Sequence, residues 1–599
     1  MSTSTHNPYT EDQVKITSSV IGMIRRLWPY LMRRPWLVLA TVSAVVSVAV
    51  FGRLSVTLFG YAIDYGLAKN DRTVILWIAG AYFVLEVSRS FLTFLHGYLF
   101  AKIGNRILFE IRSELISHVQ RLPIRFFDTN PTGRIVTRVT SDVVSLGEVF
   151  TKGLINMFTA VVSLIAILVA MLLISPKATL ATILALPPVI WGISVLSRRI
   201  FLVLRESRRK LAALNAFVGE NINGMKVLQI YDRTRHHYEK FRAQSADYRD
   251  QQMKYVRLYA LLSPMMLVFN AVAVTTALYF GGQLVLSGEV TTGAMVAFIL
   301  HVRAITEPLN TILEQYQTLQ NSLSGAERIF TLLGEPEEEN TVLIKTGQPA
   351  PPKFRGEVIF ESVSFRYRED LPLVLRDINL TVHPGESVAL VGRTGSGKST
   401  MIALLQRFYD PTEGRILIDG RSTTEIERRA LRSRLGVVQQ DTFLFRGTIA
   451  ENISLGDPSI SRADIERAAE MACLTGLLKR RPGGLDAKVE ERGANLSVGE
   501  RQLIAFARIL AFQPDILILD EATANIDSHT EDLIQEATRR VRQGRTSFII
   551  AHRTSTITDC DKIVVLDHGC IAEVGTHDEL MARKNSSLYY TQLKAGGHA

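Results

Sequence analysis

A glycine-rich loop at residues 392–400 has the composition and spacing of a phosphate-binding site. It follows the apolar strand pattern SVALV and precedes the helical pattern MIALLQRF, and it consists of Gly392, Arg393, Thr394, Gly395, Ser396, Gly397, Lys398, Ser399 and Thr400. Glycines let backbone N–H groups close around phosphate oxygens, and the start of a helix adds positive potential. We expect Lys398 to reach the β and γ phosphates of a nucleotide and Ser399 to offer its hydroxyl to Mg²⁺.

Two adjacent carboxylates follow another strongly apolar strand pattern. The stretch ILILDE ends in Asp520 and Glu521, and FIIAHR places His552 at the end of a further strand. Behind a phosphate loop in the same sheet, Asp520 suits Mg²⁺ and Glu521 can polarise the attacking water. His552 could contact the γ-phosphate and steady Glu521. The alternative for the carboxylate pair is an ordinary turn or helix cap, which the nearby phosphate loop disfavours.

A second loop of glycine and serine, NLSVGERQ at 495–502, opens onto the helical pattern LIAFARIL. Ser497 and the backbone N–H groups at the start of that helix also suit a phosphate. One chain therefore carries two loops that could bind phosphate, about a hundred residues apart.

The elements that must position these residues form an α/β pattern from residue 357 onward. Strand patterns such as GEVIFESVSFRY, GRILIDG and DKIVVLD alternate with helical stretches, which predicts a parallel sheet with antiparallel additions. Residues 331–356 contain Pro and acidic residues without periodicity and are expected to be a linker. We assign 357–599 to a nucleotide-binding domain and 1–330 to a different kind of domain.

The first 330 residues are predicted to be a membrane domain. The chain of 599 residues is 47% hydrophobic with a positive mean hydropathy, so part of its surface must face lipid. The charge of +10 could indicate nucleic acid, but Lys and Arg gather beside apolar spans, so we expect no nucleic-acid partner and acidic membrane headgroups instead. Six apolar spans are predicted, at 36–60, 75–100, 153–174, 178–200, 258–285 and 290–312.

The joints near 101–150 and 201–257 are long and basic, so we place them in the cytoplasm. Their helical patterns predict that the spans continue as helices beyond the membrane. Helix-breaking residues mark a turn near Pro123 and another near Gly224, which we interpret as docking points, with Phe126 and Phe127 as apolar contacts of the first. An ordinary helical hairpin end is the alternative.

Several ionisable residues fall inside the predicted spans, and their cost in lipid implies that they face the interior of the helical bundle. Glu86, Arg89, Thr93 and His96 share one helical stripe, which is compatible with a polar translocation path or with structural pairing inside the bundle. The others are Arg53, His301, Arg303 and Glu307.

The chain resembles ATP-binding cassette (ABC) exporters, and the resemblance covers its whole length. The motifs that carry it occur in the order found in that family: Tyr367, the 392–400 loop, VVQQD, LSVGERQ, ILILDEATANID and AHR. It implies a membrane-bound ATPase half-transporter with ATP and Mg²⁺ as cofactors, six membrane helices and a cytoplasmic nucleotide-binding domain, in a bacterial inner membrane. Tyr367 would stack on adenine, and Gln440 would reach Mg²⁺ and assist catalysis. Ser497, Gly499 and Glu500 would meet the γ-phosphate held by a second half-transporter.

The second loop departs from the family pattern Leu-Ser-Gly-Gly-Gln, because Val498 replaces a glycine and Glu500 replaces glutamine. A β-branched side chain and a negative charge beside a polyanion would weaken that contact. With Glu521 and His552 intact, this combination resembles one half of a heterodimeric exporter of hydrophobic or amphipathic drugs or lipids. A homodimer with tolerated variation, a non-pumping ATP-gated channel or regulatory subunit, and an importer built on the exporter fold remain the alternatives.

Overall fold

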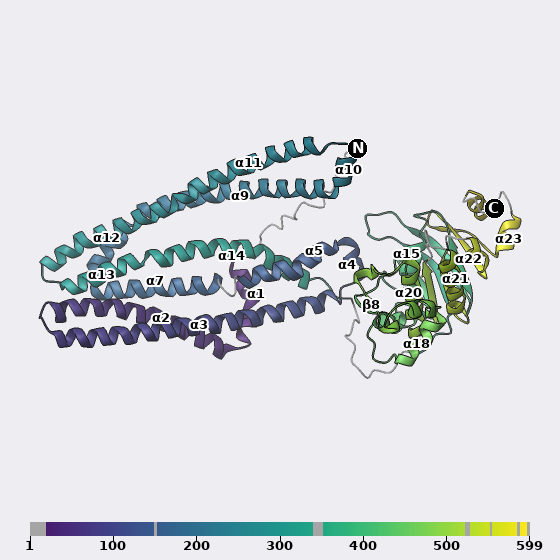
Figure 1. Ribbon diagram of the computed structural model, residues 1–599, viewed down its shortest axis with the longest axis horizontal. Helices are drawn as coiled ribbons and strands as arrows, with labels where there is room; N and C mark the ends of the chain where they lie inside the picture. Colours follow the sequence, from purple (N-terminus) through teal and green to yellow (C-terminus); the bar gives the residue numbers. More distant parts are fainter. Residues whose placement is uncertain are drawn as a thin grey trace. The chain divides into compact units, whose positions relative to one another are not determined.

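The computed structural model describes residues 20–148, 153–338, 352–520, 528–551, 554–583 and 587–595. It contains two units, drawn in Figure 1. The first comprises Met1–Gln120 and Pro131–Glu335, and the second comprises Arg121–Asn130 and Pro336–Ala599. A short segment from the first half of the chain therefore belongs to the second unit.

The first unit is entirely helical in its described residues, because its long apolar stretches can satisfy their backbone polar groups in lipid only within helices. Six helical segments are long and apolar enough to cross a membrane: Pro35–Leu67, Arg72–Val119, Leu154–Ile174, Pro176–Asn223, Thr234–Leu286 and Thr292–Gln315. They confirm the six predicted spans. The elements are α1 (Val20–Met32), α2 (Pro35–Tyr61), the π-helical turn η1 (Ala62–Leu67), α3 (Arg72–Val119), α5 (Thr132–Thr137), η2 (Arg138–Asp142), α6 (Val143–Glu148), α7 (Leu154–Ile174), α8 (Pro176–Ala185), α9 (Pro187–Asn223), α10 (Met225–Ile230), α11 (Thr234–Ala260), α12 (Leu262–Leu286), α13 (Thr292–Ala304) and α14 (Thr306–Leu333).

The predicted extensions of the spans are present as continuous helices. Helix α3 has 48 residues, so it is about 72 Å long, more than twice the thickness of a bilayer core. Helices α9 and α11 run side by side (Figure 1). Ser207 donates a hydrogen bond to Gln252 (2.6 Å), and Lys210 pairs with Asp247 (2.6 Å) across the two helices. Polar contacts thus join the two helices where their sequences become charged.

Helices α2 and α13 approach closely because glycines face each other at the contact. A Cβ on Gly60 would lie 2.7 Å from the carbonyl oxygen of Gly293, so neither position has room for a side chain. Asp64 accepts hydrogen bonds from the Gly293 N–H (2.7 Å) and the Thr291 hydroxyl (2.5 Å). A carboxylate at the N-terminus of α13 is favourable because the helix dipole is positive there.

The second unit contains a six-stranded sheet in the order β12-β11-β3-β10-β9-β6, parallel except for β12, and a four-stranded antiparallel sheet in the order β2-β1-β4-β5. This arrangement confirms the predicted parallel sheet with antiparallel additions. The strands are β1 (Val358–Phe365), β2 (Leu375–Val382), β3 (Ser387–Val391), β4 (Glu413–Ile418), β5 (Arg421–Ser422), β6 (Leu435–Val438), β7 (Gly447–Thr448), β8 (Lys488–Val489), β9 (Ile516–Asp520), β10 (Thr546–Ile550), β11 (Lys562–Asp567) and β12 (Cys570–Gly575). The helices are α4 (Ile124–Thr129), α15 (Lys398–Leu405), α16 (Arg428–Ser433), α17 (Ile449–Ser454), α18 (Arg462–Met471), α19 (Thr475–Arg480), α20 (Val498–Phe512), α21 (Ser528–Arg542), α22 (Thr554–Thr558), α23 (His577–Ala582) and α24 (Leu588–Ala595).

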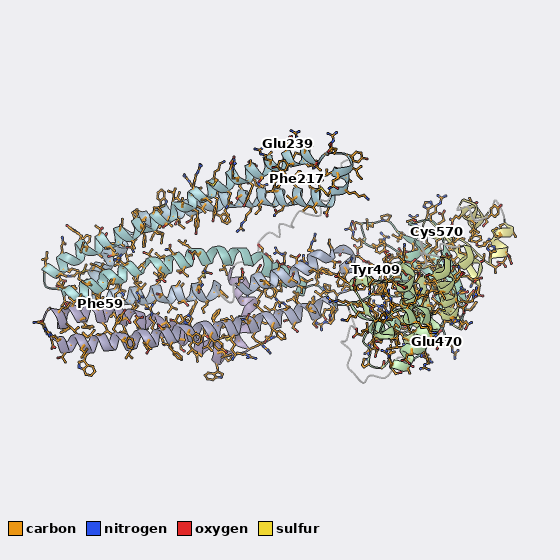
Figure 2. All side chains as sticks on the ribbon, viewed as in Figure 1. Phe59, Phe217, Glu239, Tyr409, Glu470 and Cys570 are labelled. Atoms are coloured by element: carbon orange, nitrogen blue, oxygen red, sulfur yellow. The ribbon has the colours of Figure 1, made fainter. Side chains whose placement is uncertain are left out.

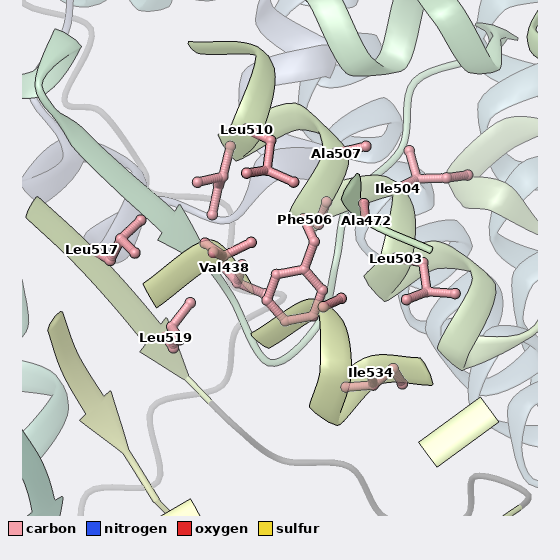
Figure 3. Packing of buried hydrophobic residues seen from close by; sticks show 14 of the residues in the cluster. Val438, Ala472, Leu503, Ile504, Phe506, Ala507, Leu510, Leu517, Leu519 and Ile534 are labelled. Carbon is pink, nitrogen blue, oxygen red and sulfur yellow. The ribbon is translucent and has the colours of Figure 1, made fainter. Parts of the chain in front are cut away.

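The six-stranded sheet has a hydrophobic core on each face. Along β9, Leu517 and Leu519 belong to one core, whereas Ile516 and Ile518 belong to the other, as the alternation of side chains along a strand requires. Figure 3 shows the first core, where Phe506 of α20 packs near Val438 and Leu519. A strand buried on both faces must be apolar throughout, which explains the sequence ILIL before Asp520.

The first of the two predicted docking turns lies in the second unit, as helix α4. Phe126 is buried and Phe127 is partly exposed, so only the first is an inserted apolar contact. Arg121 pairs with Glu337 (2.8 Å), and the hydroxyl of Tyr409, labelled in Figure 2, donates to the carboxylate of Asp128. Burial and the adjacent Asp128 raise the pKa of Tyr409. Docking of this turn is confirmed, whereas docking of the turn at Gly224, which belongs to the first unit, stays a prediction.

Candidate nucleotide-binding site

The order of the strands brings the predicted site residues to one edge of the six-stranded sheet. Strand β3 lies beside β10, β10 beside β9 and β9 beside β6, and all four are parallel. Their carboxyl ends therefore share one edge, which carries the 392–400 loop, Asp520 and Gln440. Ligands of open α/β sheets bind at this edge. Glu521 and His552, which follow β9 and Ala551 in the sequence, lie outside the described residues.

The loop after β3 turns tightly because its glycines adopt conformations closed to other residues. Gly397 has φ of +107° and directly precedes α15. A Cβ on it would lie 2.5 Å from the side chain of Leu375. A side chain at Gly397 would thus face both backbone strain and a clash. The predicted context of strand, glycine loop and helix is confirmed.

Lys398 begins α15, and its ammonium lies within the loop. Its Nζ donates to the carbonyl oxygens of Gly392 (2.6 Å) and Arg393 (3.1 Å), and only 8% of the residue is exposed. Burial lowers the pKa of Lys398, while the negative charge of Asp520 acts in the opposite direction. These two carbonyl oxygens hold the ammonium of Lys398 within the loop. A bound phosphate can replace them as the hydrogen-bond acceptor of Lys398.

The loop fits a bound phosphate. The hydroxyl of Ser396 is buried and has no hydrogen-bond partner among the residues that the structure describes, and the N–H groups of the first turn of α15 have no partner within their helix. Three oxygen-bearing side chains near the loop reach solvent: the hydroxyl of Ser399, the amide of Gln440 and, partly exposed, the carboxylate of Asp520. Mg²⁺ prefers such hard oxygen ligands. The donor set is therefore suited to a nucleotide with Mg²⁺.

Tyr367, predicted to stack on adenine, lies beside this loop. Its hydroxyl shares a hydrogen bond with that of Thr400 (3.0 Å), and its ring packs edge-to-face on Phe365 and Tyr409. The residue is 36% exposed, so part of its ring is open to a ligand. These contacts hold the ring close to the phosphate loop, and stacking on adenine stays a prediction.

The second loop is organised by the cap of helix α20. Ser497 accepts a hydrogen bond from the Glu500 N–H (3.2 Å), and the Glu500 carboxylate accepts one from the Ser497 N–H (2.9 Å). This reciprocal capping box satisfies two backbone donors at the start of the helix. Gly499 is buried, whereas Val498 is 45% exposed at the tip.

Arg481 changes the electrostatics expected at this loop. Its guanidinium lies 3.4 Å from the Glu500 carboxylate and donates to the carbonyl of Asn495 (2.7 Å). The negative charge of Glu500 is therefore partly compensated, so its predicted repulsion of a phosphate is weaker than the sequence implied. Arg481 was not singled out from the sequence, because it stands 19 residues before Glu500 and belongs to no motif. Val498 is exposed at the tip, and its predicted steric effect on a phosphate contact stays a prediction.

Among the described residues, no hydrogen bond joins the 495–502 loop to the 392–400 loop. Gln502 and Phe506 of α20 instead line a small cavity together with Asp520. Within the described residues, the second loop therefore forms no hydrogen bond that would close its tip over the phosphate loop of its own chain.

Two family models match the chain. The model described as ABC transporter transmembrane region matches residues 37–309, and the model described as ABC transporter matches residues 375–524. The first covers the membrane helices from α2 to the start of α14. The second covers the phosphate loop, the second loop and the carboxylate pair.

Relatives and a solved structure extend the match over nearly the full chain. A probable multidrug resistance ABC transporter of Bacillus subtilis, YheH, is 40% identical over 83% of this chain and 74% of its own length. The fatty acid ABC transporter of Mycobacterium bovis is 35% identical over 90% of this chain and 83% of its own. A bacterial Atm1-family ABC exporter solved with ATP bound has a TM-score of 0.74 and 28% identity, over 96% of this chain and 99% of that chain.

Replacing Gly397 tests the loop directly. Because Gly397→Ala places a Cβ at φ of +107° against Leu375, we expect ATP binding to weaken by about tenfold or more, or about 1.4 kcal/mol. Fluorescence of a trinitrophenyl-ATP analogue bound to the purified chain measures this change. Gly420→Ala is the matched control, since Gly420 also has positive φ (+77°) but open space around it. Equal losses in both variants would contradict a specific role for Gly397.

Proposed function

The chain belongs to the ABC transporter family, as an exporter half-transporter that hydrolyses ATP coupled to transport, and on this premise we propose that it is one half of a heterodimeric exporter. The observation that carries the proposal is an asymmetry within one chain. Its phosphate loop, Asp520 and Glu521 follow the family pattern, whereas Val498 and Glu500 of the second loop do not.

In the proposed pair, each ATP lies between the phosphate loop of one chain and the serine loop of the other. The exposed Val498 lies at the start of α20, which Ser497 and Glu500 cap, and it contacts the nucleotide bound by the partner. This chain's phosphate loop then works with a regular serine loop of the partner and forms the site with full turnover. The bulky Val498 caps the partner's site, which mainly holds ATP.

Seven residues of this chain divide the work at the hydrolysing site. Lys398 binds the β and γ phosphates and exchanges its present carbonyl partners for phosphate oxygens. Ser399, Gln440 and Asp520 would hold Mg²⁺, which neutralises charge on the phosphates. Glu521 orients and polarises the attacking water, and His552 steadies Glu521 and the γ-phosphate. Tyr367 stacks on adenine.

Movement at the nucleotide is proposed to reach the membrane helices through α4. This helix is part of the nucleotide-binding unit through the Tyr409–Asp128 and Arg121–Glu337 contacts, yet it continues directly from α3 in sequence. Closure of two nucleotide-binding units on ATP would therefore pull on the end of a membrane-spanning helix. Hydrolysis would release it.

The proposed substrate is hydrophobic or amphipathic, of the drug or lipid class. The relatives named for multidrug resistance and for fatty acids both support this class. Within the spans, Thr93 and His96 bond to carbonyls of their own helix and Glu86 pairs with Arg89 (3.3 Å), contacts that support structural pairing of that stripe. Among the described residues, Arg53 and His301 keep buried nitrogens without a partner, which could meet a polar group of an amphipathic substrate.

The proposed location is the bacterial inner membrane, with the nucleotide-binding units in the cytoplasm. The chain is a multi-pass membrane protein with six candidate spans, and the relatives described above are bacterial. ATP is available on the cytoplasmic side of that membrane only, so the ATP-hydrolysing unit must face it.

Removing the proposed water-activating carboxylate tests the catalytic assignment. Glu521→Gln keeps the size of the side chain but cannot accept a proton, so we expect ATP turnover to fall about a hundredfold or more while ATP still binds. Phosphate release from the transporter in proteoliposomes measures the rate. Glu536→Gln on α21 removes an exposed carboxylate and should keep normal turnover. Normal turnover of Glu521→Gln would refute the assignment of Glu521.

Purifying the chain alone tests the heterodimer. Both sites of a pair made from this chain would carry Val498, so we expect its turnover to be roughly tenfold below that of the pair with its natural partner. In the chain alone, Val498→Gly together with Glu500→Gln should raise turnover, because Gln can keep the capping-box hydrogen bond. A pure dimer of this chain with full activity and no gain from the double substitution would contradict the proposal.

A further inference from the structure

A cavity of about 390 Å³ lies at one end of the α2–α3 helical hairpin, beside α1, and is not part of the nucleotide site. Helix α3 continues beyond this cavity to Val119 and then to α4 of the ATP-hydrolysing unit, so the cavity lies toward the cytoplasmic end of the hairpin. Its wall includes the basic residues Arg33, Arg34, Lys102 and Arg106.

The cavity carries an excess of positive charge. Four of its side chains are basic and one is acidic, Glu110. That carboxylate already has two partners, since Arg33 lies 2.7 Å and Arg106 lies 3.4 Å from its oxygens. Among the residues that the structure describes, Arg34 and Lys102 form no ion pair. Two cationic groups are thus available to an anion at the mouth of the cavity.

The remaining wall is apolar. Leu37 on α2 and Ile103 and Ile107 on α3 line the cavity beside the basic groups, and Ile107 is buried. A soluble anion would satisfy the cations but leave this wall in contact with water. A ligand with an anionic head and an apolar chain satisfies both parts, because charge and apolar surface are each covered.

The position of the cavity matches the membrane interface. The apolar run of the first span begins at Pro35, directly after Arg34. Trp28 on α1 and Trp36 on α2 are exposed, Trp36 to 80%, as expected for tryptophans at the level of lipid headgroups. Basic residues beside the cytoplasmic end of a span attract anionic lipids.

We propose that this cavity is a binding site for an anionic phospholipid of the cytoplasmic leaflet. Arg34 and Lys102 contact the headgroup phosphate, and one acyl chain lies along Leu37 and Ile107. A cavity of 390 Å³ is large enough for a headgroup and the start of a chain. The site tethers α1 to the α2–α3 hairpin through lipid and is independent of the transported substrate.

Native mass spectrometry of the complete transporter tests the site. The protein, released from detergent micelles, is titrated with phosphatidylglycerol and, separately, with phosphatidylcholine of the same chains. In the wild type we expect the first phosphatidylglycerol to bind about tenfold more tightly than phosphatidylcholine. In Arg34→Gln/Lys102→Gln this preference should disappear. Raised salt should weaken phosphatidylglycerol binding to the wild type, because the contact is electrostatic.

The matched control is Lys69→Gln/Arg72→Gln, which removes two positive charges at the opposite end of the same helical hairpin. It should keep the wild-type preference. ATP turnover of both double variants checks that the transporter has folded. The proposal is overturned if the wild type binds the two lipids equally, if the control loses the preference as fully as the cavity variant, or if the cavity variant keeps it. Binding of inorganic phosphate at the wild-type site with the affinity of the lipid would also overturn it.

Discussion

ATP hydrolysis by this protein depends on one contact, between the backbone N–H groups of the 392–400 loop and the phosphates of the nucleotide. Strand β3 is buried on both faces, so the loop that leaves it is held rigidly, and Gly397 at positive φ aims the start of α15 into the loop. Such a loop surrounds a γ-phosphate from one side only. The other side needs a second set of donors, and among the described residues the 495–502 loop of the same chain forms no hydrogen bond to the phosphate loop. In the proposed pair, the serine loop of a second chain supplies these donors.

The proposed coupling between ATP hydrolysis and the membrane helices passes through helix α4. Helix α4 is only six residues long and could not be stable alone. It is held by buried Phe126, by the Asp128–Tyr409 hydrogen bond and by the ion pair of the adjacent Arg121 with Glu337. Tyr409 also contacts Tyr367, whose hydroxyl bonds to Thr400 in the phosphate loop. A continuous set of contacts within the second unit therefore connects the nucleotide site to α4, which follows α3 in the sequence.

Much of this could be predicted from the sequence, because periodicity and spacing are local. The six spans, the parallel sheet and the placement of the 392–400 loop between a strand and a helix all follow from short-range patterns. Contacts between distant residues do not. Arg481 beside Glu500 compensates a charge that had no visible partner in the sequence. Arg34 and Lys102 line one cavity only because the start of α2 packs beside α3. The helix-breaking residues around Pro123 predicted a turn. That Arg121–Asn130 belongs to the nucleotide-binding unit depends on contacts with residues far away in the sequence, so it could not be predicted in the same way.

We infer that ATP is hydrolysed only where two chains meet. To test this requirement for two chains, the protein is reconstituted into nanodiscs sized for a single copy and into nanodiscs that hold the pair. ATP binding and phosphate release are measured in both. We expect the single copy to bind ATP through Lys398 and its loop but to release almost no phosphate, whereas the pair hydrolyses ATP. Phosphate release by isolated single copies at the rate per chain of the pair would contradict it.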